Sequence, residues 1–242
     1  MSETKRLTTN EVIPFTNSDL FDLHPESKFA VGILAVGTSV YYPDENLAYH
    51  RLRANVYASQ LRIIPEDRIE FDGGEYDADD ARSAHFGVIE NLGLTQRLVA
   101  SMRIIIRGDT PLPVEEFFDE VFSGQTNPRS VEVSRYICRH EDSKTQDRLH
   151  WPLFSKALAF TMANDLSPAY AVIEEFLERK LRSRDIPFES LGSPKFVPEY
   201  ITDNLPIVID TEALGKKIES IMPGTVQSMQ DEQQSFSYFG NV

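Results

Sequence analysis

The chain has 242 residues, of which 41% are hydrophobic and 26% are charged, a balance that is ordinary for a globular protein with a sizeable core. Its formal net charge of −14 argues against nonspecific nucleic-acid binding and against binding to an anionic membrane surface, since both require a basic face. The single cysteine, Cys138, excludes an internal disulfide and favours a reducing cytoplasm. Residues 1–20 have no apolar core long enough for a signal peptide, and the longest apolar stretch, 29–40, is too short to span a membrane, so we expect a cytoplasmic protein.

The chain is predicted to begin with a polar extension, followed by a strand and a long helix. Residues 1–28 form this extension, 29–40 are predicted to be a strand, and 43–64 are predicted to be a helix that stops at Pro65. Arg53 lies on the apolar stripe of this helix, which is an unusual position for an arginine. The stripe repeats at helical spacing and comprises Tyr49, Leu52, Val56, Tyr57, Leu61 and Ile64.

Strands and helices alternate over the rest of the chain, after an acidic loop at 66–80. The expected strands are 85–90, 98–107, 131–138, 169–173, 188–191 and 207–209. The expected helices are 114–122, a helix that has Pro152 in its first turn and runs to 164, 174–184 and 211–221. We therefore expect one α/β layered domain over 29–222 and a disordered tail over 223–242.

Charged side chains occupy positions where a strand or helix is otherwise apolar. Glu132 and Arg135 lie in the strand 131–138, Arg103 lies in an earlier strand, and Arg53 lies on the helix stripe. Burying such groups is costly unless they are paired or used, so they are candidates for a functional site. The alternative is a buried ion-pair network that ties the helix to the sheet. Because Glu132 and Arg135 point to opposite faces of a regular strand, a shared site requires a β-bulge, which we predict.

Common catalytic and metal-binding motifs are missing. The chain has no nucleophile elbow, P-loop, dinucleotide-binding glycine fingerprint or zinc-binding histidine pair. The acidic stretch 72–80 lacks the central glycine and the terminal glutamate of a calcium-binding EF-hand loop. We therefore expect no metal and no permanently bound cofactor, and a solvated loop accounts for most of these carboxylates.

Four short motifs follow one another along the chain. They are Arg53…Tyr57…Leu61, Glu75-Tyr76-Asp77, Ser101-Met102-Arg103 and Glu132-Val133-Ser134-Arg135. Their order and spacing, over about residues 45–210, resemble those of the acyl-homoserine-lactone synthases, bacterial autoinducer synthases built on the GNAT N-acyltransferase fold. The resemblance implies a mixed central β-sheet flanked by helices and splayed between the Glu132 strand and the Ala169 strand. It also implies an acyl-thioester arm in the split, with the fatty chain buried between sheet and helices.

Transfer of an acyl group from a thioester to an amine needs a neutral amine, a polarised carbonyl and a protonated thiol. Glu132 is the expected base, provided that burial raises its pKa from about 4 towards neutrality. Backbone N–H groups exposed in the split are expected to stabilise the oxyanion. The arginines are expected to hold an acceptor carboxylate, or to orient Glu132 and Asp77. The catalytic candidates are Glu132, Arg135 and Ser134, and the substrate-binding candidates are Arg53, Tyr57, Asp77 and Arg103.

Two departures from the family pattern concern the acceptor. Ile63 stands where the synthases have a tryptophan, and Gly74 stands where they have the first of two aspartates, while Asp77 matches the second. In the family these positions help to bind S-adenosylmethionine. An amino acid or another small amine, as in the similar long-chain N-acyl amino acid synthases, is therefore as good an expectation as S-adenosylmethionine.

The donor is expected to be acyl-CoA or an acylated acyl carrier protein. The segment 139–148 has no glycine-rich loop of the kind that seats pyrophosphate in acetyl-CoA-dependent GNAT enzymes, which argues against an ordinary acetyltransferase. A carrier protein is acidic and needs a basic landing patch. Arg139, Lys144 and Arg148 are the candidates for binding the thioester arm or the carrier. Further candidates, for which a solvated helix face is the alternative, are Lys156, Arg179, Lys180, Arg182 and Arg184.

The sequence thus predicts an N-acyltransferase that moves a medium or long acyl chain from a CoA or carrier-protein thioester to a small amine. The competing hypothesis is a non-catalytic protein on the same fold that binds an acyl ligand or a partner. The incomplete acidic motif and the N-terminal extension favour this second hypothesis. Neither hypothesis involves nucleic acid or a membrane span.

Overall fold

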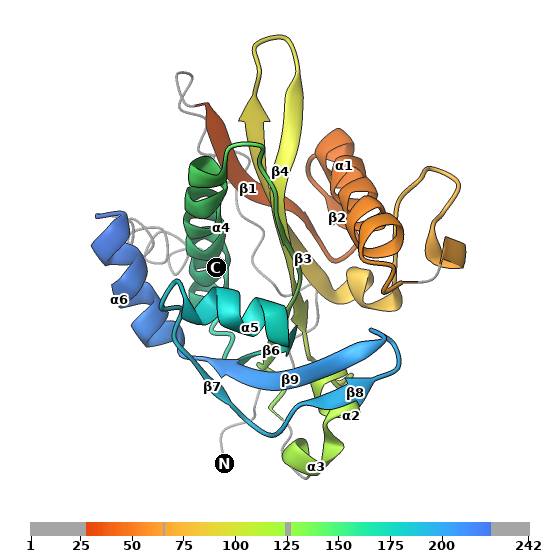
Figure 1. Cartoon of the computed structure of the whole chain (residues 1–242), viewed down its shortest axis with the longest axis vertical. Coiled ribbons are helices and arrows are strands. Elements are labelled where there is room, and N and C mark those ends of the chain that lie inside the picture. Colours follow the sequence, from red (N-terminus) through yellow and green to blue (C-terminus); the bar gives the residue numbers. More distant parts are fainter. Residues whose placement is uncertain (1–27, 65, 124–126, 224–242) are drawn as a thin grey trace, which may run out of the picture.

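A nine-stranded sheet runs through the computed structural model, which describes residues 28–64, 66–123 and 127–223 (Figure 1). The strand order is β2-β1-β3-β4-β5-β6-β9-β7, and β8 pairs with β9. Neighbouring strands are antiparallel except for β5 and β6, which are parallel. The strands are β1 (Phe29–Val36), β2 (Ser39–Val40), β3 (Ser83–Asn91), β4 (Gln96–Ile106), β5 (Val131–Cys138), β6 (Ala169–Glu174), β7 (Phe188–Ser190), β8 (Lys195–Val197) and β9 (Thr202–Ile209).

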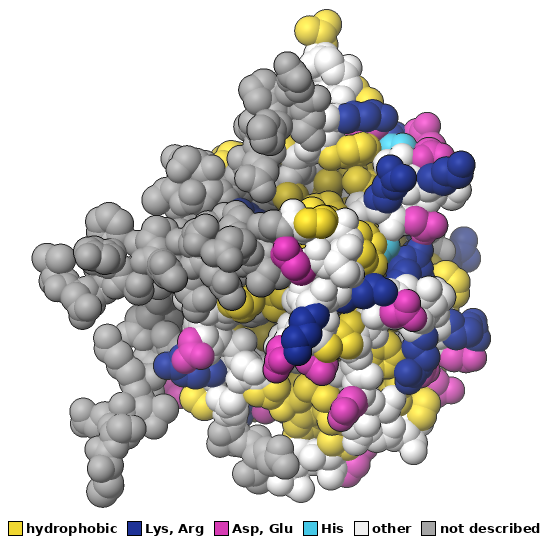
Figure 2. All heavy atoms as spheres, turned by 90° about the vertical axis from the view of Figure 1, so that its left-hand side faces the viewer, with side chains coloured by type: hydrophobic (Ala, Val, Ile, Leu, Met, Phe, Trp, Pro, Cys, Tyr) yellow, Lys and Arg dark blue, Asp and Glu magenta, His cyan; other side chains and the backbone are white. Residues whose placement is uncertain are grey.

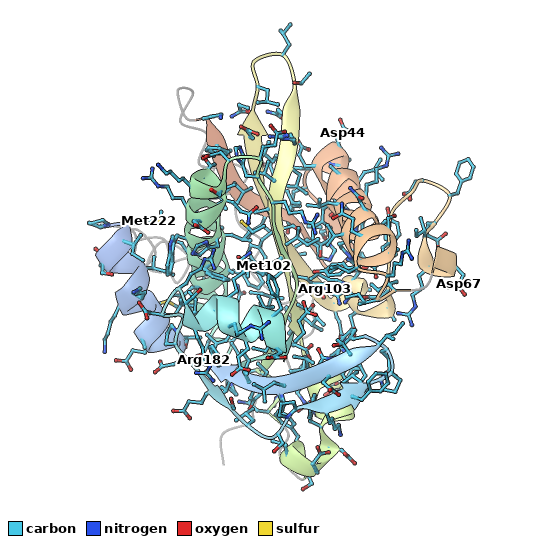
Figure 3. All side chains as sticks on the ribbon, viewed as in Figure 1. Asp44, Asp67, Met102, Arg103, Arg182 and Met222 are labelled. Atoms are coloured by element: carbon cyan, nitrogen blue, oxygen red, sulfur yellow. The ribbon has the colours of Figure 1, made fainter. Side chains whose placement is uncertain are left out.

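Helices cover both faces of the sheet, with α1 packed on one face of β1, β3 and β4 and α4 packed on the other (Figure 1). Met102 and Arg103 are neighbours on β4 and mark these faces, since Met102 packs in the core beside α4 whereas Arg103 points towards α1 (Figure 3). None of the helices in the described ranges is long and apolar enough to cross a membrane. The helical elements are α1 (Pro43–Arg53), η2 (Ala54–Gln60, a π-helix), η3 (Glu66–Arg68), η4 (Ala78–Arg82), α2 (Pro113–Phe117), α3 (Asp119–Phe122), α4 (Ser143–Ala163), α5 (Glu175–Arg182) and α6 (Thr211–Ile221).

The sheet opens between β5 and β6. These two strands pair only at their beginnings, from Val131 beside Ala169 to Val133 beside Ala171. Beyond this point β5 continues to Cys138 and β6 runs on without pairing to it. The mixed α/β sheet flanked by helices is therefore confirmed, and so is the predicted splay between the Glu132 strand and the Ala169 strand.

A β-bulge interrupts β5 at Arg135. The register against β4 shifts between Ser101 and Arg103, so that β5 has one residue more than its partner over this interval. Arg135 has a φ of 52°, in the left-handed region that a residue with a large side chain adopts only under constraint. The predicted bulge is therefore present, and it lies at Arg135 itself. It brings the Arg135 side chain to the face of the strand that also carries Ser134.

The two apolar segments nearest the N-terminus differ from their predicted extents. The stretch 29–40 is a hairpin rather than one strand, because the chain turns at Gly37, which has a φ of 57°, between β1 and β2. The predicted helix over 43–64 is also shorter, since α1 passes into the π-helix η2. There the Leu61 N–H bonds to the Val56 carbonyl, five residues back. This wider turn rotates Leu61 out of the predicted stripe, and it is 45% exposed.

Helix α4 begins well before the predicted start, so Pro152 lies inside it rather than in its first turn. The side chain of Asp142 accepts a hydrogen bond from the Thr145 N–H and caps the helix. A proline inside a helix removes one backbone hydrogen bond, but the packing of the long buried face outweighs that loss. The same face contains Lys156, which is only 6% exposed, so its assignment to a surface landing patch is wrong.

The C-terminal part of the sheet is larger than predicted. Strand β9 begins at Thr202 instead of 207, and β8 was not among the expected strands. The missed part of β9, residues 202–206, contains Asn204 and Pro206, which are residue types that strands disfavour, so only pairing with β6 and β8 reveals it. The predicted extension 1–28 and tail 223–242 lie almost entirely outside the described residues.

Candidate functional site

Buried arginines and carboxylates form an ion cluster between α1, the acidic loop and strands β4 and β5. Arg53 binds Glu75 and, at 2.6 Å, Asp80. Arg103 binds Asp77 at 2.5 Å and Asp80 at 2.7 Å. The side chains of Arg53 and Glu75 are both fully buried. The members of the cluster are Arg53, Arg103, Arg135, Glu75, Asp77 and Asp80.

Arg135 completes the cluster from the bulge of β5. Its Nη2 atom lies 3.0 Å from Glu75 and 2.9 Å from Asp77. Its guanidinium group also lies over the Tyr57 ring, 5.4 Å from the centroid. The neighbouring Ser134 hydroxyl accepts a 3.0 Å hydrogen bond from Nε of an arginine on β4. The structure thus contains the buried ion-pair network that was the alternative interpretation of these charges in the sequence. The network lies next to the split in the sheet.

The carboxylates of the cluster remain ionised. Burial alone would raise their pKa values, but the facing guanidinium groups hold the pKa values of Glu75 and Asp77 below their usual range. The pKa of Asp80 is lowered first by its hydrogen bond with His85 and then by Arg53 and Arg103. Three positive and three negative groups therefore balance inside the fold. The expected orienting role involved both Glu132 and Asp77. Two of the arginines bind Asp77, whereas no hydrogen bond or ion pair within the described residues joins an arginine to Glu132.

Gly74 leaves no room for the aspartate that the synthases carry at this position. The Tyr76 ring stacks on His50 with centroids 3.9 Å apart. A Cβ atom added at Gly74 would lie 2.6 Å from the Tyr76 ring and 2.9 Å from the Cβ atom of His50. The stacking of Tyr76 on His50 therefore requires glycine at position 74, and the carboxylate beside it is that of Asp72, which accepts a hydrogen bond from the Gly74 N–H. Over the described residues, no group of side chains has the composition of a metal site.

Glu132 lies on the same face of β5 as the ion cluster but outside it. Its Oε2 atom accepts a 2.7 Å hydrogen bond from the Val114 N–H at the start of α2, and the residue is only 1% exposed. Burial raises the pKa of this carboxyl to about 8, against the lowering effects of that hydrogen bond and of Arg103. Its Oε1 atom has no hydrogen bond to any described residue. Glu132 therefore exchanges its proton near neutral pH, as a general acid or base must.

A cavity of about 300 Å³ occupies the split between β5 and β6, and Glu132 is among its lining residues. The walls beside α4 and α6 are apolar, with Ala157 and Leu158 from α4 and Leu214 from α6. Its lining residues Leu61, Phe176 and Arg139 are exposed and mark its mouth. The cavity thus joins an opening to the surface, an apolar chamber and a carboxyl group that titrates near neutrality.

The remaining predicted site residues lie around this cavity. Tyr57, Ser134 and Arg135 line it, whereas Asp77 and Arg103 lie behind them in the ion cluster. The Tyr57 hydroxyl donates a 3.2 Å hydrogen bond to the Tyr136 carbonyl in the bulge. Ile63, which replaces the tryptophan of the synthases, also lines the cavity.

The predicted basic patch is only partly at the cavity. Arg139 and Lys180 line the cavity, and Lys144 and Arg148 are exposed near the start of α4. The arginines of α5 are paired with acidic neighbours, as in the 2.5 Å pair of Arg179 with Glu175. Lys, Arg, Asp and Glu side chains are interspersed over the coloured part of the face in Figure 2 rather than segregated by sign.

Three residues of the site were absent from the sequence prediction. Glu75 belongs to a quoted motif, but nothing in the sequence pairs it with two arginines. Asp80 follows Asp77 by three residues and completes a capping box on η4, a spacing that sequence inspection can detect. Tyr200, which lines the cavity beside Glu132, lies in an irregular segment that has no sequence signal.

No protein-family model matches the chain, and no curated protein matches it. Among solved structures, a CoA-dependent acyl-homoserine lactone synthase, BjaI, with SAM and isopentyl-CoA, is similar with a TM-score of 0.56 and 20% identity, over 75% of this chain and 84% of that chain. The acyl-homoserine lactone synthase LasI gives a TM-score of 0.59 and 17% identity, over 78% of this chain and 94% of its own.

The same fold occurs in FeeM, an N-acyl amino acid synthase from uncultured soil microbes. Its TM-score is 0.58 and its identity 15%, over 80% of this chain and 96% of that chain. Identities of this size establish the fold alone. The chain therefore has the GNAT-like fold of the acyl-homoserine lactone synthases, in agreement with the motif order in its sequence.

Proposed function

We propose that this chain is an N-acyltransferase, which moves a medium or long acyl chain from a CoA or carrier-protein thioester to a small amine. The observation that carries the proposal is Glu132, a buried carboxyl with a pKa of about 8 in the lining of the cavity between β5 and β6. A base of this pKa is useful for accepting a proton from an attacking amine. The fold shared with synthases of two acyl-transfer classes supports the proposal.

The reaction proceeds by attack of the amine nitrogen on the thioester carbonyl carbon. Glu132 takes the amine proton at Oε1, while backbone N–H groups of β5 left unpaired beyond Val133 stabilise the oxyanion. Collapse of the intermediate breaks the carbon–sulfur bond, and the proton held by Glu132 passes to the thiolate. The products are an amide and a free thiol, and the enzyme returns to its starting protonation state.

The donor arm enters at the mouth of the cavity and the acyl chain fills its apolar end. Exposed Phe176 and Leu61 present apolar surface there, beside the cation of Arg139. This combination suits a pantetheine arm whose phosphate remains near solvent. Lys144 and Arg148, which are exposed near the start of α4, extend this contact to CoA or to an acidic carrier protein.

One observation favours the second candidate, a non-catalytic acyl-binding protein. The arginines expected to hold an acceptor are largely occupied by Glu75, Asp77 and Asp80. The two functions are separated by incubating the protein with dodecanoyl-CoA, a mixture of the proteinogenic L-amino acids and S-adenosylmethionine, and measuring free thiol. We expect thiol release that depends on the amines and an N-acyl product by mass spectrometry. Tight binding of dodecanoyl-CoA without amine-dependent thiol release contradicts catalysis and supports the binding protein.

The pH dependence of the reaction is expected to follow Glu132. The charged form is the base, and at pH 7 only about one molecule in ten carries it when the pKa is about 8. When it is expressed per concentration of neutral amine, kcat/KM should therefore rise about tenfold per pH unit up to that value and level off above it. The measurement uses two acceptors whose amine pKa values differ. An inflection near 8 that persists with both belongs to the enzyme, whereas one that moves with the amine contradicts the assignment.

Ala157 is the position at which the apolar end of the cavity can be filled. It lies on α4, is 6% exposed and lines the cavity. Replacing Ala157 by Phe is expected to lower kcat/KM for hexadecanoyl-CoA by about 10- to 100-fold while hexanoyl-CoA changes much less, because only the long chain reaches the added ring. If kcat/KM falls equally for the two donors, the acyl chain does not bind next to Ala157.

A further inference from the structure

The polar side of the cavity contains hydrogen-bonding groups that the fold itself does not use. The Ser134 oxygen accepts from an arginine, and the Tyr57 O–H donates to a backbone carbonyl. Arg135 uses Nε and Nη2 in the ion cluster, which leaves its Nη1 atom without a partner in the described chain. Two further lining atoms have no described partner, Oε1 of Glu132 and the hydroxyl of Tyr200.

Tyr200 is held in place by a strained segment between β8 and β9. Its N–H donates to the Val197 carbonyl at 3.1 Å, and its ring meets Phe117 edge to face at 5.4 Å. The next residue, Ile201, has a φ of 54° and is 58% exposed. A β-branched residue in the left-handed region is strongly disfavoured, and it persists only where its surroundings enforce it. The turn thus keeps Tyr200 over the cavity while its apolar neighbour faces solvent.

The surroundings of Tyr200 keep its hydroxyl a donor. Burial, followed by the nearby charge of Glu132, raises the pKa of Tyr200 to about 12, against the lowering effects of Arg135 and Arg103. The phenol therefore stays protonated across the working pH range. A protonated phenol donates a hydrogen bond to an anionic group of a bound substrate.

We propose that the Tyr200 hydroxyl and Nη1 of Arg135 form the subsite for the amine acceptor, binding a carboxylate next to its amine and placing that amine at Oε1 of Glu132. One neutral donor from the β8–β9 segment and one cationic donor from β5 line the same cavity, and the charges of Arg135 and Glu132 both act on the Tyr200 hydroxyl. Since the acyl chain requires the apolar side, the polar side is left for the acceptor. This inference rests on the proposed N-acyl transfer and adds the position of its second substrate.

The test compares Tyr200→Phe with the unchanged protein, using dodecanoyl-CoA and whichever proteinogenic L-amino acid or S-adenosylmethionine gives the fastest thiol release. We expect the acceptor KM to rise about tenfold on loss of the hydroxyl, with the donor KM and the melting temperature unchanged. The carboxamide of the same acceptor should be a poorer substrate for the unchanged protein. The difference in acceptor KM between the carboxylate and the carboxamide should be smaller in Tyr200→Phe, because the variant has already lost the hydroxyl that binds the carboxylate.

Tyr41→Phe is the control, since Tyr41 packs against the core of β1, β3 and β4 and is not among the cavity-lining residues. It should leave both KM values unchanged. The inference is overturned if the acceptor KM of Tyr200→Phe stays within about twofold of that of the unchanged protein. It is also overturned if the donor KM rises as much as the acceptor KM, or if the melting temperature of the variant is lowered. If the unchanged protein releases no amine-dependent thiol, the proposed function itself fails, which is a different result.

Discussion

Replacing Glu132 by Gln is expected to lower kcat/KM for amine acylation by about 10²- to 10⁴-fold, the usual contribution of a positioned base. The amide can still accept the hydrogen bond from the Val114 N–H that Oε2 accepts now. It cannot take a proton from the amine. The measurement is amine-dependent thiol release from dodecanoyl-CoA. Binding of dodecanoyl-CoA should persist, because the apolar wall of the cavity is unchanged.

The same substitution should stabilise the protein, which separates loss of catalysis from loss of structure. Burial raises the folded pKa of Glu132 to about 8, whereas the unfolded carboxyl titrates near 4.3. Between these two pKa values the carboxyl ionises only in the unfolded state, so the free energy of unfolding falls as pH rises. The fall is roughly 1.4 kcal/mol per pH unit, beginning at the unfolded pKa and ending at about pH 8. Urea denaturation should therefore show Glu132→Gln more stable by about 1–3 kcal/mol at pH 8, with a smaller gap at lower pH.

Full activity of Glu132→Gln would exclude Glu132 as the base. A variant that is inactive and also less stable at pH 8 would contradict the raised pKa, because a buried ionised carboxylate must cost more than the amide that replaces it. Only the combination of lost turnover and gained stability agrees with a base whose pKa is raised by burial.

Replacing Arg53 by Met is expected to destabilise the fold by about 3–5 kcal/mol, because it leaves buried carboxylates with too little positive charge. Glu75 is fully buried and loses its contact with Nε, while Asp80 loses a 2.6 Å partner. Methionine fills much of the volume of the arginine side chain, so the loss of stability is due to the missing positive charge rather than to a cavity. The measurement is the free energy of unfolding in urea at neutral pH.

Arg51→Met is the matched control on the same helix. Arg51 is exposed and donates only to the Asp72 carbonyl, so its removal should change the free energy of unfolding by less than about 0.5 kcal/mol. The carboxylates of the cluster have lowered pKa values, so their contribution is present above about pH 4 and is lost as pH falls further. A stability of Arg53→Met within about 1 kcal/mol of the unchanged protein would mean that water or rearrangement satisfies the freed carboxylates.

The elements that the sequence located correctly are those whose local pattern and packing agree. Strand β5 has the predicted bounds, from Val131 to Cys138, because alternation and β-branched residues coincide with pairing to β4. Helix α6 also has its predicted bounds, 211–221. Where packing outweighs local preference the prediction was wrong, as at Pro152 inside α4 and Pro206 inside β9. Neither position could be predicted, because the compensating contacts come from residues distant in sequence.

The functional site, like the fold, could be predicted only in part from the sequence. Charges inside apolar elements pointed to Glu132, Arg53, Arg103 and Arg135 from the sequence alone, because an isolated charge in such a position is costly wherever the chain folds. The sequence could not decide which of these charges pair with one another. Only the tertiary structure places three arginines on Glu75, Asp77 and Asp80 and leaves Glu132 outside, next to an open cavity.

The physical reason for this division is the range of the forces involved. Periodicity, capping and the cost of isolated charge act within a few residues, and from them the order of most elements and the need for a bulge in β5 could be predicted. Pairing, burial and the resulting pKa values depend on residues brought together from across the chain. The tertiary structure therefore decided that the sheet opens beside Glu132, that Tyr200 reaches the cavity, and that one carboxyl among the many of this acidic chain titrates near neutral pH.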